Sequence, residues 1–154
     1  MQSKVELEQL LVLRKSCRAF NDVEVPMGIV DSILWAGERA PYASGGPRRK
    51  LIVVRDKETK MKLQEACAGQ TYVGSADSVF ICCGFDRDIP GNVMRNGQEK
   101  KVADCYASVM CMNLASEDKG LGSCWIGNFE VCEVKDVLQV AEQPIIILVV
   151  GFAK

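Results

Sequence analysis

The segment that most constrains this chain is the glycine-rich stretch from Gly120 to Phe129, which reads Gly-Leu-Gly-Ser-Cys-Trp-Ile-Gly-Asn-Phe. Its three glycines let the backbone come close to a flat group, while the apolar side chains between them anchor the turn. One interpretation is therefore a wall against a planar ligand. The alternative is a helix C-cap at Gly120 or Gly122, followed by a short strand and a turn.

Length and charge limit the possible classes of protein. The chain has 154 residues, with 19 basic and 20 acidic side chains, so we expect a single domain over residues 1–154 and no overall field that favours nucleic acid. The longest apolar run, from Ile145 to Val150, has the length of a strand and not of a membrane span. The first residues lack the basic and apolar regions of a signal peptide, which favours a cytoplasmic protein that does not bind membranes.

The chain has eight cysteines and no histidine. Because no Cys-x-x-Cys spacing occurs, we expect no metal site. Cys82 and Cys83 lie in an apolar strand pattern, and Cys105 and Cys111 lie in a helical one, which favours buried, reduced thiols. A thiol-based redox or metal protein is the competing interpretation. Without histidine the commonest general base is missing, so in an enzyme we expect something other than a side-chain base to carry out the difficult chemistry.

The hydrophobic periodicity predicts an α+β order of elements and not a doubly wound dinucleotide fold. A capping box formed by Ser3 and Glu6 is expected to start the first helix, and Met61 and the run from Leu63 to Ala66 are expected to face inward. We expect Asp86 to Gly97 to be the most exposed and mobile segment. Helices are predicted at Lys4–Leu13, Pro26–Arg39, Lys57–Ala68, Gln98–Lys119 and Val131–Leu138, and strands at Lys50–Arg55, Ser78–Phe85 and Pro144–Phe152.

Two further segments carry polar or rigid patterns. Arg14, Ser16 and Arg18 alternate after the first helix, and an extended backbone would place both guanidinium groups and the hydroxyl on one side, where they suit a phosphate. The alternative is a solvated polar edge. The segment from Ala40 to Arg49 contains two prolines and two glycines, so we expect a loop that holds a fixed shape.

Taken together, these segments resemble the FMN-dependent nitroreductase family. The resemblance covers nearly the whole chain in the family's order, and it is most specific in the stretch from Gly120 to Phe129 and next most specific from Arg14 to Phe20. It implies a homodimer of an α+β fold, in which a central, mostly antiparallel sheet of about four strands is flanked by helices.

The resemblance also implies roles for individual residues. The FMN phosphate and ribityl chain would be held by Arg14, Lys15, Ser16 and Arg18. The residues against the isoalloxazine, contributed across the dimer interface, would be Pro41, Tyr42, Ala43 and Gly45. The opposite wall would be formed by Trp125, Ile126 and Gly127, with the Gly127 N–H directed at flavin N5, and Gln70 would reach the pyrimidine edge.

The implied reaction needs no catalytic side chain. NAD(P)H and an electron-poor small molecule, such as a nitroaromatic or a quinone, would exchange hydride in turn through flavin N5, while the protein supplies position and electrostatics. The alternative is a non-catalytic flavin- or nucleotide-binding module of the same fold.

The chain departs from the family pattern in three places. Gly45-Gly46-Pro47-Arg48-Arg49 stands where family members usually have Asn or Arg and then Gln-Pro-Trp, and we expect Arg48 and Arg49 to be an exposed basic pair, with a phosphate contact as the alternative. The sequence ends at Lys154, short of the basic residue and the wrapping arm of the family, which predicts weaker FMN binding and a less tightly clasped dimer. The short connection from Asp86 to Gly97 leaves little material for a lid and predicts an open, unselective site.

Overall fold

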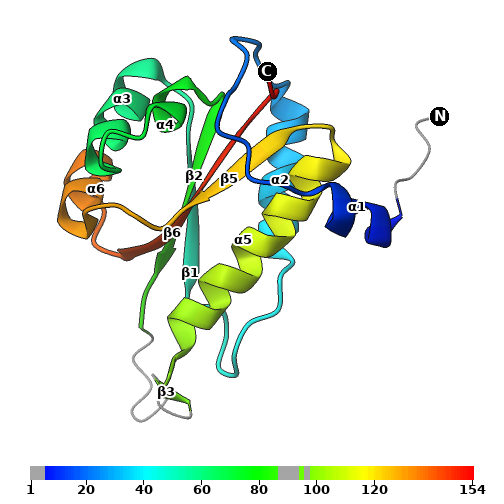
Figure 1. The fold of residues 1–154 in the computed structure, drawn as a ribbon. Coiled ribbons are helices and arrows are strands. Elements are labelled where there is room, and N and C mark those ends of the chain that lie inside the picture. Colours follow the sequence, from blue (N-terminus) through cyan, green and yellow to red (C-terminus); the bar gives the residue numbers. More distant parts are fainter. Residues whose placement is uncertain (1–5, 87–93, 96–97) are drawn as a thin grey trace.

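The computed structural model of the chain describes residues 6–86, 94–95 and 98–154. Figure 1 shows a central sheet with helices on both of its sides. The helices are α1 (Leu7–Leu13), α2 (Met27–Glu38), α3 (Lys57–Ala66), α4 (Thr71–Ser75), α5 (Lys100–Asp118) and α6 (Val131–Leu138). The strands are β1 (Arg49–Val54), β2 (Ser78–Gly84), β3 (Met94–Arg95), β4 (Gln98–Glu99), β5 (Gly122–Ile126) and β6 (Gln143–Gly151).

The four longer strands form the central sheet in the order β1-β2-β6-β5, and every neighbouring pair is antiparallel. All seven residues of β2 are buried, as the apolar pattern on both of its faces predicted. The expected α+β class with an antiparallel sheet of about four strands is therefore confirmed. Because β5 lies at one edge of this sheet, its free side can pair with another segment of the chain.

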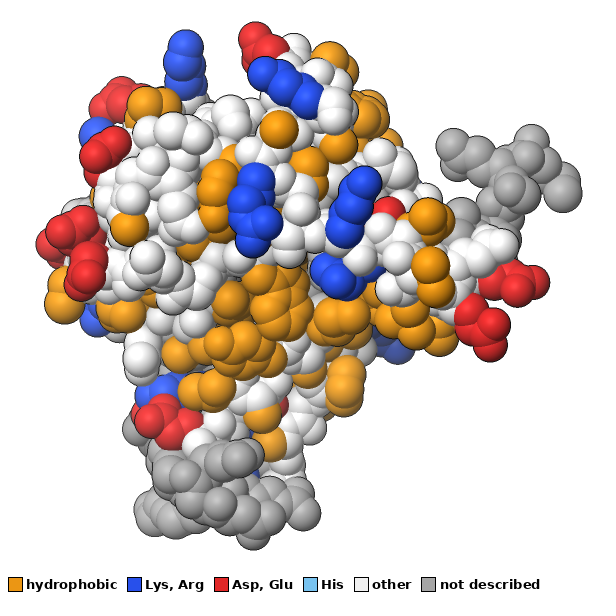
Figure 2. All heavy atoms as spheres, in the orientation of Figure 1, with side chains coloured by type: hydrophobic (Ala, Val, Ile, Leu, Met, Phe, Trp, Pro, Cys, Tyr) orange, Lys and Arg blue, Asp and Glu red, His pale blue; other side chains and the backbone are white. Residues whose placement is uncertain are grey.

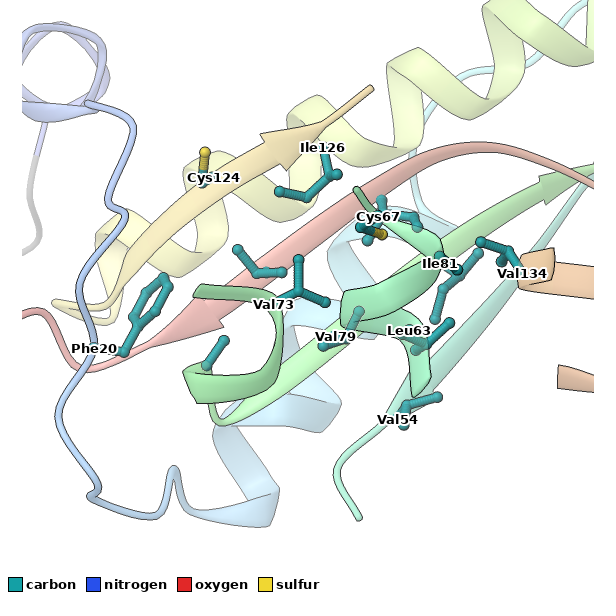
Figure 3. Close-up of a cluster of buried hydrophobic side chains, with 14 of the residues drawn as sticks. Phe20, Val54, Leu63, Cys67, Val73, Val79, Ile81, Cys124, Ile126 and Val134 are labelled. Atoms are coloured by element: carbon teal, nitrogen blue, oxygen red, sulfur yellow. The ribbon is translucent and has the colours of Figure 1, made fainter. Parts of the chain in front are cut away.

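One hydrophobic core lies between the sheet and the helices α3, α4 and α6 (Figure 3). Leu63, Val73 and Val134 come from the three helices and pack against Val79 and Ile81 of β2. Burial of one such leucine stabilises the fold by about 2 to 3 kcal/mol. The helix α6 begins and ends at the residues predicted from the sequence.

The second core lies on the opposite face of the sheet, under α2 and α5. Ile33 of α2 and Met112 of α5 pack there against Phe80 of β2. The two helices cross at Gly37, where a Cβ would lie only 2.8 Å from Cγ of Met112, so this close approach requires a glycine. The long helix α5 therefore packs against this face of the sheet.

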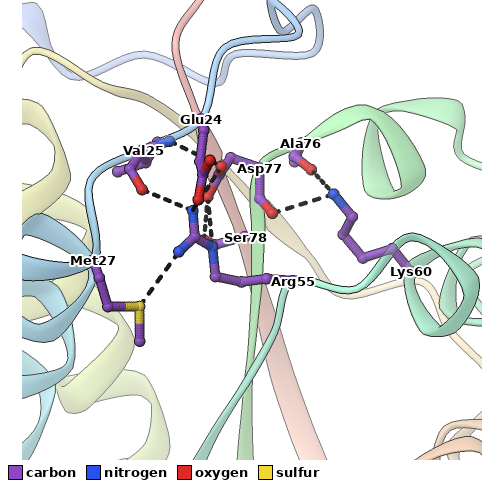
Figure 4. A network of polar contacts seen from close by, with 8 residues as sticks. All are labelled: Glu24, Val25, Met27, Arg55, Lys60, Ala76, Asp77 and Ser78. Carbon is purple, nitrogen blue, oxygen red and sulfur yellow. Dashed lines mark hydrogen bonds and ion pairs between the residues drawn. The ribbon is translucent and has the colours of Figure 1, made fainter.

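A network of polar contacts fixes the chain just before α2 to the adjoining ends of β1 and β2 (Figure 4). Arg55 donates to both carboxylate oxygens of Asp77, from Nε at 3.1 Å and from Nη2 at 3.0 Å, and also donates to the Val25 carbonyl. The same carboxylate accepts hydrogen bonds from the Val25 N–H and the Ser78 hydroxyl. Burial acts to raise the pKa of Asp77, but these hydrogen bonds outweigh it and hold the pKa below the ordinary value.

The boundaries of two helices differ from the predictions. The helix α3 ends at Ala66 and not at Ala68, because Ala68 and Gly69 adopt positive φ angles of 57° and 71° and end the helix. The short helix α4, which the sequence did not predict, then follows. On α3, Leu63 and Ala66 are buried as expected, whereas Met61 is 44% exposed and does not face inward.

At the other end of the molecule, α5 begins at Lys100 because Gln98 and Glu99 pair with β3. Pro26 is the N-cap of α2 and not its first helical residue.

Two predictions concern residues that the structure does not describe: Ser3 of the predicted capping box and most of the Asp86–Gly97 segment lie outside the described residues. In the part of the chain that is described, no helix is both long and apolar enough to cross a membrane.

The cysteines are free thiols, and five of them are buried: Cys67, Cys82, Cys83, Cys105 and Cys124. Burial raises the pKa of Cys67 to about 11 and that of Cys83 to about 12. Thiols with pKa values this high are inert at neutral pH, in keeping with a packing role. Among the residues that the structure describes, no group of three or more metal-ligating side chains is placed to hold an ion.

Candidate functional site

The segment after α1 lies against the free edge of β5. Ser16 and Ser123 form a parallel bridge, and the Cys17 N–H donates to the Ser123 carbonyl at 2.8 Å. The contact is close because Gly122 has no side chain: a Cβ there would lie 2.7 Å from Sγ of Cys17. The two segments that the sequence singled out, far apart along the chain, therefore meet side by side.

A pocket of about 320 Å³ lies where they meet. Its lining comes from the segment after α1, from the C-terminal half of α5 and from β5: Arg14, Ser16, Met110, Asn113, Ser123, Cys124 and Trp125. Asn113 is buried in α5 and donates to the Ser123 hydroxyl, which fixes the floor of the pocket. Sequence reasoning did not assign Asn113 to the site, although a buried amide in an otherwise apolar arc was the available signal.

Three basic side chains lie at this pocket or in the segment that borders it. Within the described residues, Arg14, Lys15 and Arg18 form no ion pair, although Arg14 is half-buried. Burial raises the pKa of the Cys124 thiol, while the charge of Arg18 and a hydrogen bond with Ser16 act against this. Figure 2 shows basic side chains above a hydrophobic patch on this face. The arrangement suits an anion next to an apolar surface.

The end of β5 presents alternate residues to the two faces of the sheet. Trp125 is 36% exposed, and its ring centre lies 5.7 Å from that of Tyr106 on α5. Ile126 is buried in the core, so it can contribute to the predicted wall only through its main chain. Gly127 is exposed, and a Cβ there would meet no atom within 4 Å. The surface at Gly127, two residues after Trp125, is thus open.

Gly120 is a helix C-cap, as one interpretation of the glycine-rich stretch proposed. Its φ is 72°, its N–H donates to the Glu117 carbonyl, and the Leu121 N–H donates to the Ser116 carbonyl. The short strand β5 follows at once. The glycine-rich stretch therefore ends α5 and also brings Trp125 and Gly127 to the pocket, so the two interpretations are compatible.

Gln70 lies next to the turn that follows β5. Its amide nitrogen donates to the carbonyls of Cys67 and Asn128, at 2.7 and 3.1 Å, and its amide oxygen accepts from the Tyr72 hydroxyl. The whole amide is therefore engaged in fixing this turn. The expected contact between Gln70 and a flavin edge stays a prediction.

The loop with Pro41, Tyr42, Ala43 and Gly45 does not line this pocket in the same chain. It is attached to α5 at Asp104, nine residues before Asn113, which is roughly 14 Å along the helix axis. The expectation that Arg48 and Arg49 form an exposed basic pair is wrong. Arg48 is fully buried and Arg49 is half-buried, because loop carbonyls surround both guanidinium groups.

The residues at the pocket fit a flat, phosphorylated cofactor such as FMN. The lining supplies the Arg14 guanidinium group and the hydroxyls of Ser16 and Ser123, which suit a phosphate, and Lys15 and Arg18 belong to the same short segment. The exposed Trp125 ring and the open space at Gly127 suit an aromatic ring system. The assignment of individual residues to the cofactor stays a prediction.

Comparisons with known proteins support the same assignment. The chain is 26% identical to the "Putative NADH dehydrogenase/NAD(P)H nitroreductase" of Archaeoglobus fulgidus, over 95% of this chain and 83% of that protein. It is 29% identical to a Bacillus subtilis protein named "FMN reductase", with NAD(P)H in its name, over 79% of this chain. There the match spans only 54% of the relative's length.

The fold is also that of a solved structure. A nitroreductase family protein from Clostridium novyi NT superposes with a TM-score of 0.89 and 20% identity, over 97% of this chain and 86% of that one. A family model described as "Nitroreductase family" matches residues 11–152, which is nearly the whole sequence. The chain therefore belongs to the nitroreductase family.

Proposed function

We propose that this protein is an FMN-dependent oxidoreductase that uses NAD(P)H to reduce electron-poor small molecules such as nitroaromatics or quinones. The observation that carries the proposal is one pocket in which Arg14 and Ser16 meet Trp125 of β5. Within the described residues, the cations of the Arg14–Arg18 segment form no ion pair. The names of the relatives, which include a nitroreductase and an FMN reductase, support the choice of cofactor and coenzyme.

The segment from Arg14 to Arg18 would hold the phosphate. Its extended backbone is fixed to β5 by the hydrogen bond from Cys17 to Ser123, so the side chains of Arg14 and Ser16 are presented to the pocket in a set position. Lys15 and Arg18 add positive charge nearby. Because no carboxylate of the described chain competes for these cations, their full charge is available to a bound anion.

The end of β5 would position the ring system. Trp125 supplies an apolar surface that Tyr106 supports from α5, and the main chain at Gly127 is open to close approach. When bound, FMN supplies the electron-pair transfer. The protein's part is to bind the cofactor, to orient it and to leave one face accessible.

A second copy of the chain would complete each site. Large apolar side chains are exposed on α1, α2 and α5, and they include Val12 at 83%, Trp35 at 62% and Tyr106 at 41%. The loop around Tyr42 is 54% exposed at that residue and lies outside the pocket of its own chain. We therefore assign the protein as a homodimer in which this loop faces the flavin of the partner subunit.

The proposal is tested with the purified protein. After incubation with FMN and removal of free cofactor, we expect a yellow protein whose visible absorption is bleached rapidly when NADH or NADPH is added without oxygen. A protein that binds FMN but is not bleached by either coenzyme would be a flavin-binding module. A colourless protein that takes up no FMN would contradict the proposed function altogether.

A further inference from the structure

The loop from Ala40 to Pro47 is fixed to α5 by one buried carboxylate. Asp104 is only 1% exposed, and its two oxygens accept main-chain N–H groups from the middle of the loop and from the residue that follows it. The Ala43 N–H donates to Oδ1 at 2.7 Å, and the Arg48 N–H donates to Oδ2 at 2.9 Å. Asp104 therefore fixes the segment from Ala43 to Arg48 relative to α5.

The side chains of Arg48 and Arg49 donate hydrogen bonds to main-chain carbonyls of the same loop. Arg48 donates from Nη1 to the carbonyls of Ser44 and Gly46, at 3.1 and 3.2 Å. The turn at this point needs glycine, because Gly45 and Gly46 have φ angles of 95° and 94°. The carbonyls of Ser44 and Gly46, which would otherwise bind water, thus accept hydrogen bonds from the Arg48 side chain at the end of the loop.

Arg49 makes a comparable set of contacts with the start of the loop. Its guanidinium group donates to the carbonyls of Glu38, Ala40 and Pro41, at distances of 3.1, 2.6 and 3.0 Å, and its Cζ lies 6.0 Å from the centre of the Tyr42 ring. The loop is therefore rigid although its outer residues, such as Tyr42, are exposed.

We propose that Asp104, with Arg48 and Arg49, is a positioning residue for the cofactor site: it presets the loop around Tyr42 in the shape that completes the flavin site of the partner subunit. This inference rests on the proposed function. A loop that is already ordered loses little conformational freedom when a ligand binds against it, so the preset shape contributes directly to affinity. Asp104 itself does not contact the cofactor.

The first experiment replaces Asp104 by asparagine. An amide has one accepting oxygen and one N–H₂ group, so Asp104→Asn keeps the volume of the side chain but can accept from only one of the two N–H groups. We expect hydrogen exchange at the Ala43 and Arg48 amides of the cofactor-free protein to accelerate about tenfold or more. We expect FMN affinity to fall by about tenfold or more. The matched control is Asp118→Asn, at the exposed far end of α5, which should change neither value.

The second experiment tests whether the loop acts across the dimer. Asp104→Asn and Arg18→Ala chains carrying different affinity tags are co-expressed, and only mixed dimers are purified. If the loop serves the partner, one site of each mixed dimer combines both defects and the other has neither, so half of the sites regain wild-type FMN affinity. If the loop serves its own chain, both sites stay defective, and this result would overturn the proposal.

Further outcomes are equally decisive. If Asp104→Asn fails to fold, Arg49→Lys, which keeps the charge but loses the planar fork, is used in both experiments with the same expectations. Faster exchange with unchanged FMN affinity would show that the clamp only stabilises the loop, and the positioning role would be wrong while the proposed function stood. Absence of FMN binding by the wild-type protein would instead remove the proposed function and this inference together.

Discussion

Two groups of basic side chains in this protein have opposite surroundings. Arg55 is held by the carboxylate of Asp77 and the carbonyl of Val25, so its charge is neutralised within the fold (Figure 4). Arg14 and Arg18 have no carboxylate partner among the described residues and lie beside a pocket. A cation that is paired with a carboxylate of the fold contributes to stability. A cation without such a partner is available to bind a ligand. Substitutions should therefore separate folding from binding.

The largest effect is expected at Asp77. Asp77→Ala removes the partner of Arg55 and leaves the Val25 N–H without its acceptor, because the Asp77 side chain is only 8% exposed and little water can replace it. We expect the free energy of unfolding to fall by about 3 kcal/mol. Chemical denaturation measures this loss. Asp31→Ala on the exposed face of α2 is the control and should change stability by less than about 0.5 kcal/mol.

A smaller effect, of a different kind, is expected at Arg18. Losing one charged contact with the phosphate should weaken FMN binding by about 1.5 to 3 kcal/mol, which is roughly tenfold to more than a hundredfold. The unfolding free energy of cofactor-free Arg18→Ala should stay unchanged. Lys62→Ala, on α3 at the opposite face of the sheet, removes the same charge and serves as the control in titrations with FMN. Equal FMN affinity of Arg18→Ala and wild type would show that Arg18 does not hold the phosphate.

The pH dependence should separate the same two regions. A phosphate monoester loses half of its charge below about pH 6, so FMN affinity should fall by about 1 kcal/mol between pH 7.5 and pH 5. The pKa of Asp77 is lowered in the folded state, so its contribution to stability is present above the ordinary value of 3.8 and is lost only as the pH falls through the folded pKa. The free energy of unfolding and the FMN affinity are measured in parallel at each pH. A decline of both near pH 6 would contradict this distinction.

The smallest effect is expected at Gly127. A Cβ at this position meets no atom of the chain, so Gly127→Ala should change the free energy of unfolding by less than about 0.5 kcal/mol. FMN affinity should fall slightly, and Gly127→Val should weaken it further, because the added methyl groups occupy the space that the ring system needs. A graded loss from glycine to alanine to valine in FMN titrations checks this. If all three proteins bound FMN with equal affinity, the flavin would not lie against Gly127.

Most elements of the fold could be predicted from local patterns. The continuous apolar run of β2 and the helical spacing of α5 and α6 depend on neighbours in the sequence, and the structure confirms them. The short helix α4 was missed, because five residues after a glycine carry too little periodicity to predict a helix. The exposure of Met61 was also missed, since an apolar residue on a helix does not reveal which neighbours will cover it.

The site was predicted only in part. The sequence pointed to Arg14, Ser16 and Trp125, and all three line one pocket. It missed Asn113, whose role depends on a strand that begins nine residues later in the chain. Arg48 was misjudged for a related reason: a charged side chain is expected at the surface unless many acceptors surround it, and the loop carbonyls that do so are brought together only by the turn.

By itself, the sequence determined the chemistry that this protein can offer: cations and a hydroxyl for an anion, an aromatic edge with glycines for a flat group, and no histidine for acid-base work. Tertiary structure alone decided which charges are free to act. Arg48 and Arg55 are enclosed by acceptors, whereas Arg14 and Arg18 have no carboxylate partner among the described residues. The physical reason is that the state of a charge depends on the groups within a few ångströms of it, and in this fold many of those groups come from distant parts of the chain.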